Sequence, residues 1–202
     1  MSHHVAGIVL AGGASRRMGR AKAGLVHDGR TFLAHVLGAL RGAGIDHVIL
    51  VSGSAHEAVL AAGPSGDDAC VLRNPDPERG QLSSLKIALG ALRTRQPRPH
   101  AAVMALVDHP AVQPATVAGL ISAWSDTPQA TIVLPVFAGR RGHPVLFAES
   151  VWDELLATPD ELGARAVVHA DATRVLEIPV DDAGVRIDVD TPDDFRRLAA
   201  RA

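Results

Sequence analysis

The chain has 202 residues, of which 47% are hydrophobic and 21% are charged, and its formal net charge is −2. This length is enough for one domain with a sizeable buried core, and the composition is ordinary for a soluble globular protein. The near-neutral charge argues against nucleic acid as the main partner, because binding to a phosphate backbone normally needs a basic excess. No apolar run is long enough to span a bilayer, so we expect no membrane partner.

Short apolar runs alternate along the chain with longer stretches of helical pattern. The expected strands are residues 5–10, 47–51, 70–73, 101–107, 131–137, 144–147 and 175–180. The expected helices are residues 31–43, 55–62, 82–95, 114–124, 151–156, 163–169 and 192–200. This alternation predicts a single α/β domain over residues 1–202 with a mainly parallel sheet. The less regular segment from 139 to 190 is expected to add some antiparallel strand.

The single cysteine, Cys70, cannot form an intrachain disulfide. It lies in the apolar run 69–72, where we expect a small core residue rather than a nucleophile. The N-terminus passes directly into the first strand, which leaves no room for a signal peptide. Together these points predict a cytoplasmic protein.

The first expected strand ends in a glycine-rich basic loop, LAGGASRRMGRAK at residues 10–22. Adjacent Gly12 and Gly13 let the backbone approach a ligand and turn its N–H groups inward, and Arg17 and Lys22 can donate to phosphate oxygens. The loop matches neither the G-x-G-x-x-G fingerprint nor the G-x-x-x-x-G-K-[ST] loop. It is therefore either a different kind of phosphate-binding loop or a solvated strand-to-helix turn.

Acidic residues follow at two further positions where strands or extended segments end. Asp108 comes directly after the most apolar strand, where a carboxylate needs a partner such as Mg²⁺ shared with substrate phosphates, or else caps the next turn. Near the C-terminus, alternation predicts that Asp188 and Asp190 share one face of an extended segment. We expect Asp188 to complete the metal site with Asp108. Asp190 either joins them or only caps the last helix, for which Thr191 is also a plausible N-cap.

Taken together, these motifs resemble the nucleotidyltransferases of glycosyltransferase-A-like fold, and within them the molybdenum cofactor cytidylyltransferase-like (MobA/MocA-like) NTP transferases. The resemblance covers nearly the whole chain. It is carried by LAGGASRRMG at 10–19 with Lys22, NPD at 74–76, GQLSSL at 80–85, DHP at 108–110, GRRGHPV at 139–145 and DVDTPDDF at 188–195. It implies a three-layer, Rossmann-like α/β nucleotidyltransferase domain.

The resemblance also implies roles for individual residues. The nucleotide would be bound by Leu10, Ala11, Gly12, Gly13, Gly80, Ser83 and Ser84. Arg17 and Lys22 would hold the triphosphate, and Asp108 and Asp188 would bind Mg²⁺. The acceptor pocket would be formed by His109, Gly142 and His143, although His143 could instead only support its loop.

The implied reaction is transfer of CMP from CTP to the terminal phosphate of molybdopterin, with release of pyrophosphate. An acceptor phosphate is already ionised near neutral pH, so catalysis would rest on positioning and charge stabilisation without a protein general base. A molybdenum hydroxylase is the client protein that the resemblance suggests. Three alternatives stay open: a guanylyltransferase that uses GTP, a sugar-1-phosphate nucleotidyltransferase, and a non-catalytic chaperone that inserts the finished cofactor.

Overall fold

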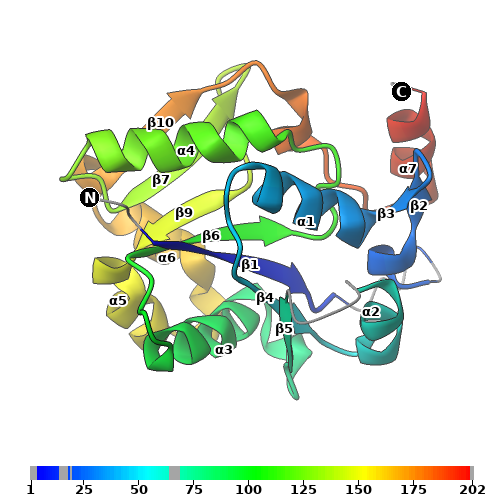
Figure 1. The fold of residues 1–202 in the computed structure, drawn as a ribbon, viewed down its shortest axis with the longest axis horizontal. Coiled ribbons are helices and arrows are strands. Elements are labelled where there is room, and N and C mark those ends of the chain that lie inside the picture. Colours follow the sequence, from blue (N-terminus) through cyan, green and yellow to red (C-terminus); the bar gives the residue numbers. More distant parts are fainter. Residues whose placement is uncertain (1–3, 14–17, 19, 64–68, 201–202) are drawn as a thin grey trace.

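The computed structural model describes residues 4–13, 18, 20–63 and 69–200, and a mixed β-sheet runs through its middle (Figure 1). In the described part of the chain this sheet has eight strands in the order β10-β7-β9-β6-β1-β4-β5, with β8 paired to β7. Its strands are β1 (Val5–Ala11), β4 (Val48–Ser52), β5 (Ala69–Arg73), β6 (Ala101–Leu106), β7 (Ile132–Phe137), β8 (Arg140–Arg141), β9 (Val145–Ala148) and β10 (Val175–Pro179). A separate two-stranded ribbon joins β2 (Val26–His27) and β3 (Arg30–Thr31).

The pairing confirms the predicted mainly parallel sheet with an antiparallel addition. β1 lies between β4 and β6 and is parallel to both, and β5 continues the parallel run beyond β4. β9 is antiparallel to β6 and β7, and β8 is antiparallel to β7. The antiparallel strands thus fall in the segment whose sequence pattern was least regular.

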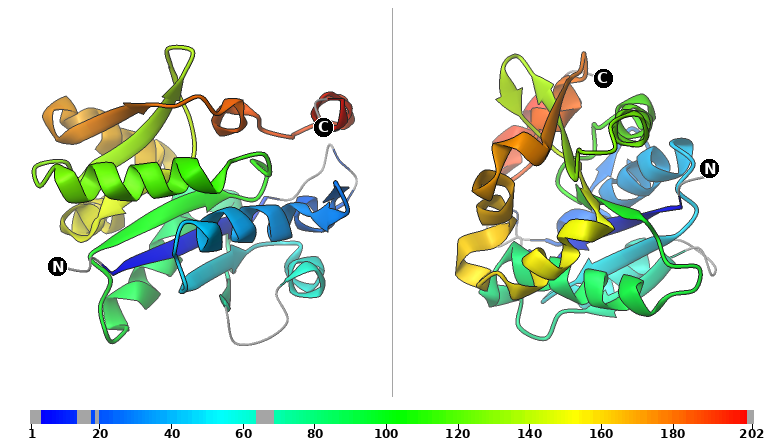
Figure 2. Two further views of the ribbon diagram at one scale, coloured as in Figure 1. Left: turned by 45° about the horizontal axis from the view of Figure 1, so that its top comes forward. Right: turned by 90° about the vertical axis from the view of Figure 1, so that its left-hand side faces the viewer.

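Helices cover both faces of the sheet, as both views in Figure 2 show. They are α1 (Phe32–Gly42), α2 (His56–Ala62), α3 (Gln81–Thr94), α4 (Pro114–Asp126), α5 (Trp152–Ala157), α6 (Gly163–Ala170) and α7 (Pro192–Ala199). Residues of α1 and α4 pack into one hydrophobic cluster, and residues of α3, α5 and α6 pack into the other. The sheet is therefore the middle of three layers, which is the arrangement that buries a parallel sheet on both faces.

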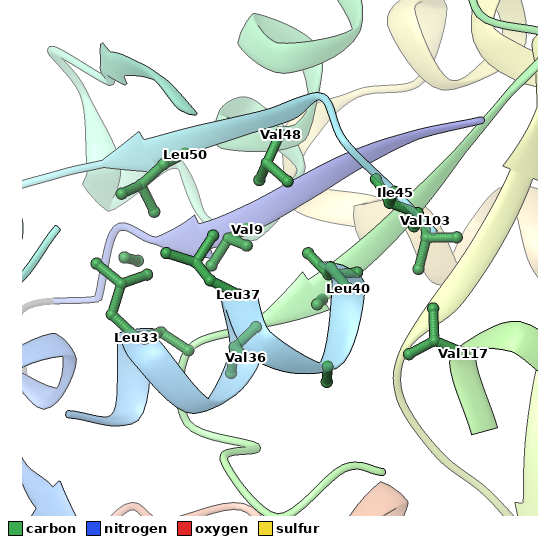
Figure 3. Close-up of a cluster of buried hydrophobic side chains, with 14 of the residues drawn as sticks. Val9, Leu33, Val36, Leu37, Leu40, Ile45, Val48, Leu50, Val103 and Val117 are labelled. Atoms are coloured by element: carbon green, nitrogen blue, oxygen red, sulfur yellow. The ribbon is translucent and has the colours of Figure 1, made fainter. Parts of the chain in front are cut away.

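The central strand β1 is completely buried, and its side chains alternate between the two clusters. Val9 packs with residues of α1, as Figure 3 shows for Leu33, Val36 and Leu37, whereas Ile8 packs toward the α3 side. This alternation follows from strand geometry, in which successive side chains point to opposite faces.

Side-chain caps fix where two helices begin, next to segments that carry candidate site residues. The Thr31 side chain accepts a hydrogen bond from the Ala34 N–H at 3.0 Å and so caps α1. Thr191 and Asp194 form a reciprocal capping box at the start of α7, which satisfies N–H groups that the helix cannot. The predicted N-cap at Thr191 is confirmed.

The boundaries of these strands and helices lie within two residues of those expected from the sequence, apart from the two-residue strands β2, β3 and β8, which the apolar pattern did not reveal. The prediction that Cys70 is a core residue is wrong, because its side chain is exposed. Cys70 lies on β5, which pairs on one side with β4 and ends the sheet. An edge strand has fewer neighbours to cover its side chains. Over the residues that the structure describes, no helix is both long and apolar enough to cross a bilayer.

Candidate active site

A cavity of about 440 Å³ opens beyond the carboxyl ends of the parallel strands. Leu10 to Gly13 continue from β1 into its wall, and Leu106 to Asp108 do the same from β6. Ligands of open α/β sheets bind at this edge, where loops from several strands converge. The cavity is therefore the candidate active site, and the glycine-rich loop forms one of its walls.

Two glycines let the backbone segments around this cavity approach one another. A Cβ atom on Gly53, after β4, would lie 2.3 Å from the carbonyl oxygen of Gly12, so no side chain fits there. A Cβ atom on Gly12 would lie 3.1 Å from Ser84 Oγ, on the opposite wall. The loop therefore presents backbone without side chains toward α3, which allows the backbone to approach a ligand closely.

Three charged residues meet in the wall of the cavity. The Lys22 ammonium donates to Asp108 Oδ2 at 2.9 Å and also to Asp190 Oδ1. All three residues line the cavity, and their side chains are 12%, 25% and 34% exposed, respectively. Burial alone would lower the pKa of Lys22, but the two carboxylates outweigh it and hold that pKa above its ordinary value. Lys22 is therefore charged at neutral pH and neutralises part of the negative charge beside it.

This cluster joins segments that are far apart in the sequence. Lys22 begins a short 3-10 helix after the glycine-rich loop, and Asp108 follows β6 directly. The Val189 N–H donates to the Asp108 carbonyl oxygen at 2.9 Å, which holds the segment before α7 against the end of β6. Because Val189 is buried, this contact places Asp190 beside Lys22.

Asp190, and not Asp188, is the carboxylate that the structure brings to Lys22 and Asp108. Asp188 is exposed and is absent from the cavity wall, although it is close enough to His109 to influence the pKa of that imidazole. The sequence pattern favoured Asp188 as the second metal ligand, and that role stays a prediction. In the described part of the chain, no group of three or more His, Cys, Asp or Glu side chains is arranged to hold a metal.

A network of uncharged hydrogen bonds supports another part of the cavity wall. Gly80 and Ser84 line it, whereas Ser83 lies behind, with its hydroxyl donating to the Gly80 carbonyl oxygen at 2.7 Å. The Asn74 amide donates to both serine hydroxyls, at 2.8 Å to Ser83 and 2.9 Å to Ser84. Site prediction from the sequence missed Asn74, even though the Asn-Pro-Asp turn in which it lies was part of the resemblance.

The three residues predicted to bind the acceptor lie beside the cavity but do not line it. The rings of His109 and His143 meet edge-on with centroids 5.2 Å apart, over a much smaller, mostly apolar void. Burial lowers the pKa of His109, and it lowers the pKa of His143 to about 4. A Cβ atom on Gly142 would lie 2.4 Å from the Val185 carbonyl oxygen, so close packing requires a glycine there. The acceptor role of these residues stays a prediction.

Comparison with known families decides which enzymes this chain resembles. The MobA-like NTP transferase domain matches residues 7–175. The chain belongs to this family. It is therefore a nucleotidyltransferase, and its α/β fold is the one found in that group.

The relatives of this MobA-like chain carry different names. It is 36% identical to the Mycobacterium tuberculosis protein Rv0371c, with a TM-score of 0.85 and 99% of each chain covered. A second crystal structure of Rv0371c is described as a complex with manganese; it is 34% identical, with a TM-score of 0.79, and covers 98% of this chain and 100% of its own. The chain is 27% identical to the molybdenum cofactor cytidylyltransferase of Escherichia coli (strain K12), over 93% of this chain and 92% of that protein. It is 28% identical to the nicotine blue oxidoreductase of Paenarthrobacter nicotinovorans, over 96% of each.

One predicted site residue of this MobA-like domain cannot be placed. Arg17 lies outside the described residues, so its expected contact with a triphosphate stays a prediction. The match to the family spans the cavity wall from Leu10 to Asp108 and ends before Asp190.

Proposed function

We propose that this chain transfers CMP from CTP to the terminal phosphate of molybdopterin in a Mg²⁺-dependent reaction that releases pyrophosphate. The observation that carries the proposal is the cluster of Lys22, Asp108 and Asp190 in the wall of a cavity that the glycine-rich loop also lines. Similarity to the E. coli cytidylyltransferase along most of both chains supports the choice of CTP and molybdopterin.

The donor set at this cluster fits a divalent cation. Asp108 and Asp190 come from separate segments, and their carboxylate oxygens already share one cation, the Lys22 ammonium. Mg²⁺ is typically held by one or two carboxylates with substrate phosphates and water completing its octahedron. We therefore assign Mg²⁺ to Asp108 and Asp190, with Asp188 as the competing second ligand. The manganese complex of the similar Rv0371c supports the use of a divalent metal.

The chain's own residues would act mainly by positioning and by charge. Leu10 to Gly13 present backbone along the cavity, where N–H groups can hold phosphate oxygens. Lys22, charged at neutral pH, offsets the negative charge that builds on the leaving pyrophosphate. When bound, Mg²⁺ would supply further neutralisation of phosphate charge. An oxygen of the acceptor phosphate forms the new bond to the α-phosphorus, and the bond from that phosphorus to the pyrophosphate oxygen breaks.

The acceptor is the least constrained part of this proposal. Relatives of nearly equal identity are named as a cytidylyltransferase and as an oxidoreductase, so identity alone does not choose the acceptor. A guanylyltransferase that uses GTP keeps the same cavity and the same chemistry. An insertion chaperone would bind the finished cofactor without cleaving a triphosphate. The cluster of Lys22, Asp108 and Asp190 in the cavity wall, which can hold a metal and phosphates, favours the enzyme.

The test is product formation with purified protein, molybdopterin and each of CTP, GTP and ATP, with Mg²⁺ or with EDTA. We expect pyrophosphate release and a cytosine dinucleotide product, seen by mass spectrometry, only with CTP, Mg²⁺ and molybdopterin together. A guanine product would keep the mechanism and replace the base. Absence of pyrophosphate release with every triphosphate, despite binding of the finished cofactor, would instead support the chaperone.

A further inference from the structure

Asn74 is a buried polar residue that connects three segments around the cavity. The residue is only 3% exposed, and it directly follows β5. Its backbone N–H donates to the Ser52 carbonyl oxygen at 2.8 Å and so extends the pairing of β5 with β4. The sheet therefore holds Asn74 in place, independently of the contacts that its side chain makes.

The hydrogen bonds of the Asn74 side chain determine which way its amide faces. Oδ1 accepts from the Asp76 N–H at 2.9 Å, and a backbone N–H can only donate. The NH₂ group must then face α3, where Ser83 Oγ and Ser84 Oγ lie at 2.8 Å and 2.9 Å. An amide nitrogen has two hydrogens and no lone pair to offer, so both serine hydroxyls accept from it.

This arrangement leaves the two serines with different roles. The Ser83 hydroxyl accepts from Asn74 and donates to the Gly80 carbonyl oxygen at 2.7 Å, so both of its functions are used inside the protein. Ser84 also accepts from Asn74, which directs its own hydrogen elsewhere. Ser84 lines the cavity, and its Oγ is 3.1 Å from the position of a Cβ on Gly12. Ser84 therefore offers a hydrogen-bond donor to whatever occupies the cavity.

We propose that Asn74 is a positioning residue that turns the Ser84 hydroxyl into a donor for the nucleoside part of the bound triphosphate. This inference rests on the proposed function. Among the described residues that line the cavity, Lys22 is the cation, whereas the acid Glu78 lies near Gly80 in the chain. Charge therefore favours the phosphates beside Lys22 and the nucleoside beside Gly80 and Ser84. Bases and ribose carry carbonyl, ring-nitrogen and hydroxyl acceptors, which an uncharged donor can bind.

The variant Asn74→Asp reverses the direction of this hydrogen bond with little change of shape. Aspartate keeps an oxygen for the Asp76 N–H but has no N–H of its own, so Ser84 must donate to it and turn its hydrogen away from the cavity. We expect the dissociation constant of CTP with Mg²⁺, measured by calorimetric titration, to rise about tenfold, the scale of one lost hydrogen bond. Because the proposal places the reacting phosphates beside Lys22, kcat at saturating CTP should change less than about threefold while the KM for CTP rises about tenfold.

Two controls separate positioning from charge and from general disruption. Inorganic tripolyphosphate has no nucleoside, so its affinity for Asn74→Asp should stay within about twofold of wild type, whereas plain repulsion by the new carboxylate would weaken it as well. Ser125→Ala removes a serine hydroxyl that donates to the Ile121 carbonyl oxygen on α4, outside the cavity lining, and should leave CTP binding within about twofold. Thermal unfolding of each variant establishes that the protein being titrated is folded.

A double-mutant cycle with Ser84→Ala decides whether Asn74 acts through Ser84. Ser84→Ala alone should weaken CTP binding about tenfold, and adding Asn74→Asp should weaken it by less than a further twofold or so. Additive penalties, an unchanged affinity in Ser84→Ala, or an equal loss of tripolyphosphate binding would each overturn the role given to Asn74. A wild-type protein that binds no nucleoside triphosphate would refute the proposed function and this inference together, whereas normal wild-type binding with additive penalties refutes this inference alone.

Discussion

Asp108 and His109 are neighbours in the chain, but their side chains lie in two different environments. Asp108 faces the cavity of about 440 Å³ and pairs with Lys22. His109, only 8% exposed, faces the small void that it shares with His143. One turn thus separates two kinds of polar group. The charged side chains meet in an open cavity, where a ligand can replace the contacts that they make with one another, whereas burial keeps the imidazoles neutral.

Asp108→Ala is the substitution at the Lys22, Asp108 and Asp190 cluster from which we expect the largest effect. A divalent ion at a phosphoryl-transfer site contributes several kcal/mol of charge stabilisation, so its loss should lower kcat/KM for CTP by about 10³-fold or more. Asp108 is one-quarter exposed, and Asp190 still pairs with Lys22 in the variant, so the melting temperature should change little. Steady-state pyrophosphate release and thermal unfolding measure the two effects. Near-normal turnover of the variant would remove Asp108 from the metal site.

Lys22→Ala tests the other partner in the same ion pairs. Removal of one donor that stabilises charge in the transition state typically costs about 10²-fold in kcat, and we expect a loss of this size in pyrophosphate release. Lys22→Arg is the matched control, because it keeps the charge but changes the shape of the donor. If Lys22→Ala kept the wild-type rate, Lys22 would be only a structural partner of the two carboxylates.

A smaller effect distinguishes the two candidate second carboxylates. Asp190→Asn removes a charge that contacts Lys22, and we expect kcat/KM to fall about tenfold or more, the scale of one hydrogen bond to a charged group. Asp188→Asn is the matched control, and we expect a change of less than about threefold because an exposed charge is screened by solvent. The Mg²⁺ concentration at half-maximal rate should rise only for Asp190→Asn. The opposite ranking would restore the metal role predicted for Asp188.

The ranking of these two aspartates also shows where prediction from the sequence stops. The strands and helices were predictable because the spacing of apolar residues reports burial, as the completely buried β1 illustrates. The places of Gly12 and Asp108 in the cavity wall were predictable because both residues follow strand ends, where α/β proteins bind ligands. The choice of Asp190 depends on the long-range hydrogen bond from Val189 to Asp108, which no local pattern encodes.

Two other residues fell outside prediction for the same physical reason. Asn74 lies in a turn with an ordinary turn sequence, and its importance comes from α3 packing against it, so that two serine hydroxyls meet its amide. Cys70 lies in an apolar run that looks like a core strand, but the order of strands in the sheet puts β5 at the edge. The contacts of Asn74 and the exposure of Cys70 both depend on how segments distant in the sequence pack together. The residues next to each of them in the sequence do not determine that packing.

The buried imidazole of His143 predicts how the stability of the protein depends on pH. Burial, together with the nearby charges of His109 and Arg186, lowers the folded-state pKa of His143 to about 4, with Asp108 acting in the opposite direction. Below the unfolded pKa near 6.5, the unfolded chain binds a proton at this imidazole that the folded protein does not. The contribution of His143 to the free energy of unfolding must therefore fall as the pH drops from about 6.5 to 4 and then level off. The part due to His143 is roughly 3 kcal/mol, since one pKa unit corresponds to about 1.4 kcal/mol.

Denaturant unfolding of wild type and His143→Gln at several pH values measures this contribution. The variant should lose less stability than wild type between pH 6.5 and pH 4, because glutamine does not titrate. Parallel slopes would mean that the imidazole of His143 is not kept neutral by burial. The same variant tests the predicted acceptor role at pH 7. If His143 binds the acceptor, its substitution must raise the KM for molybdopterin and leave the KM for CTP unchanged. If His143 only packs against His109, the substitution should change neither KM. Asp108 would then belong to the active site, and His109 and His143 would only stabilise the structure beside it.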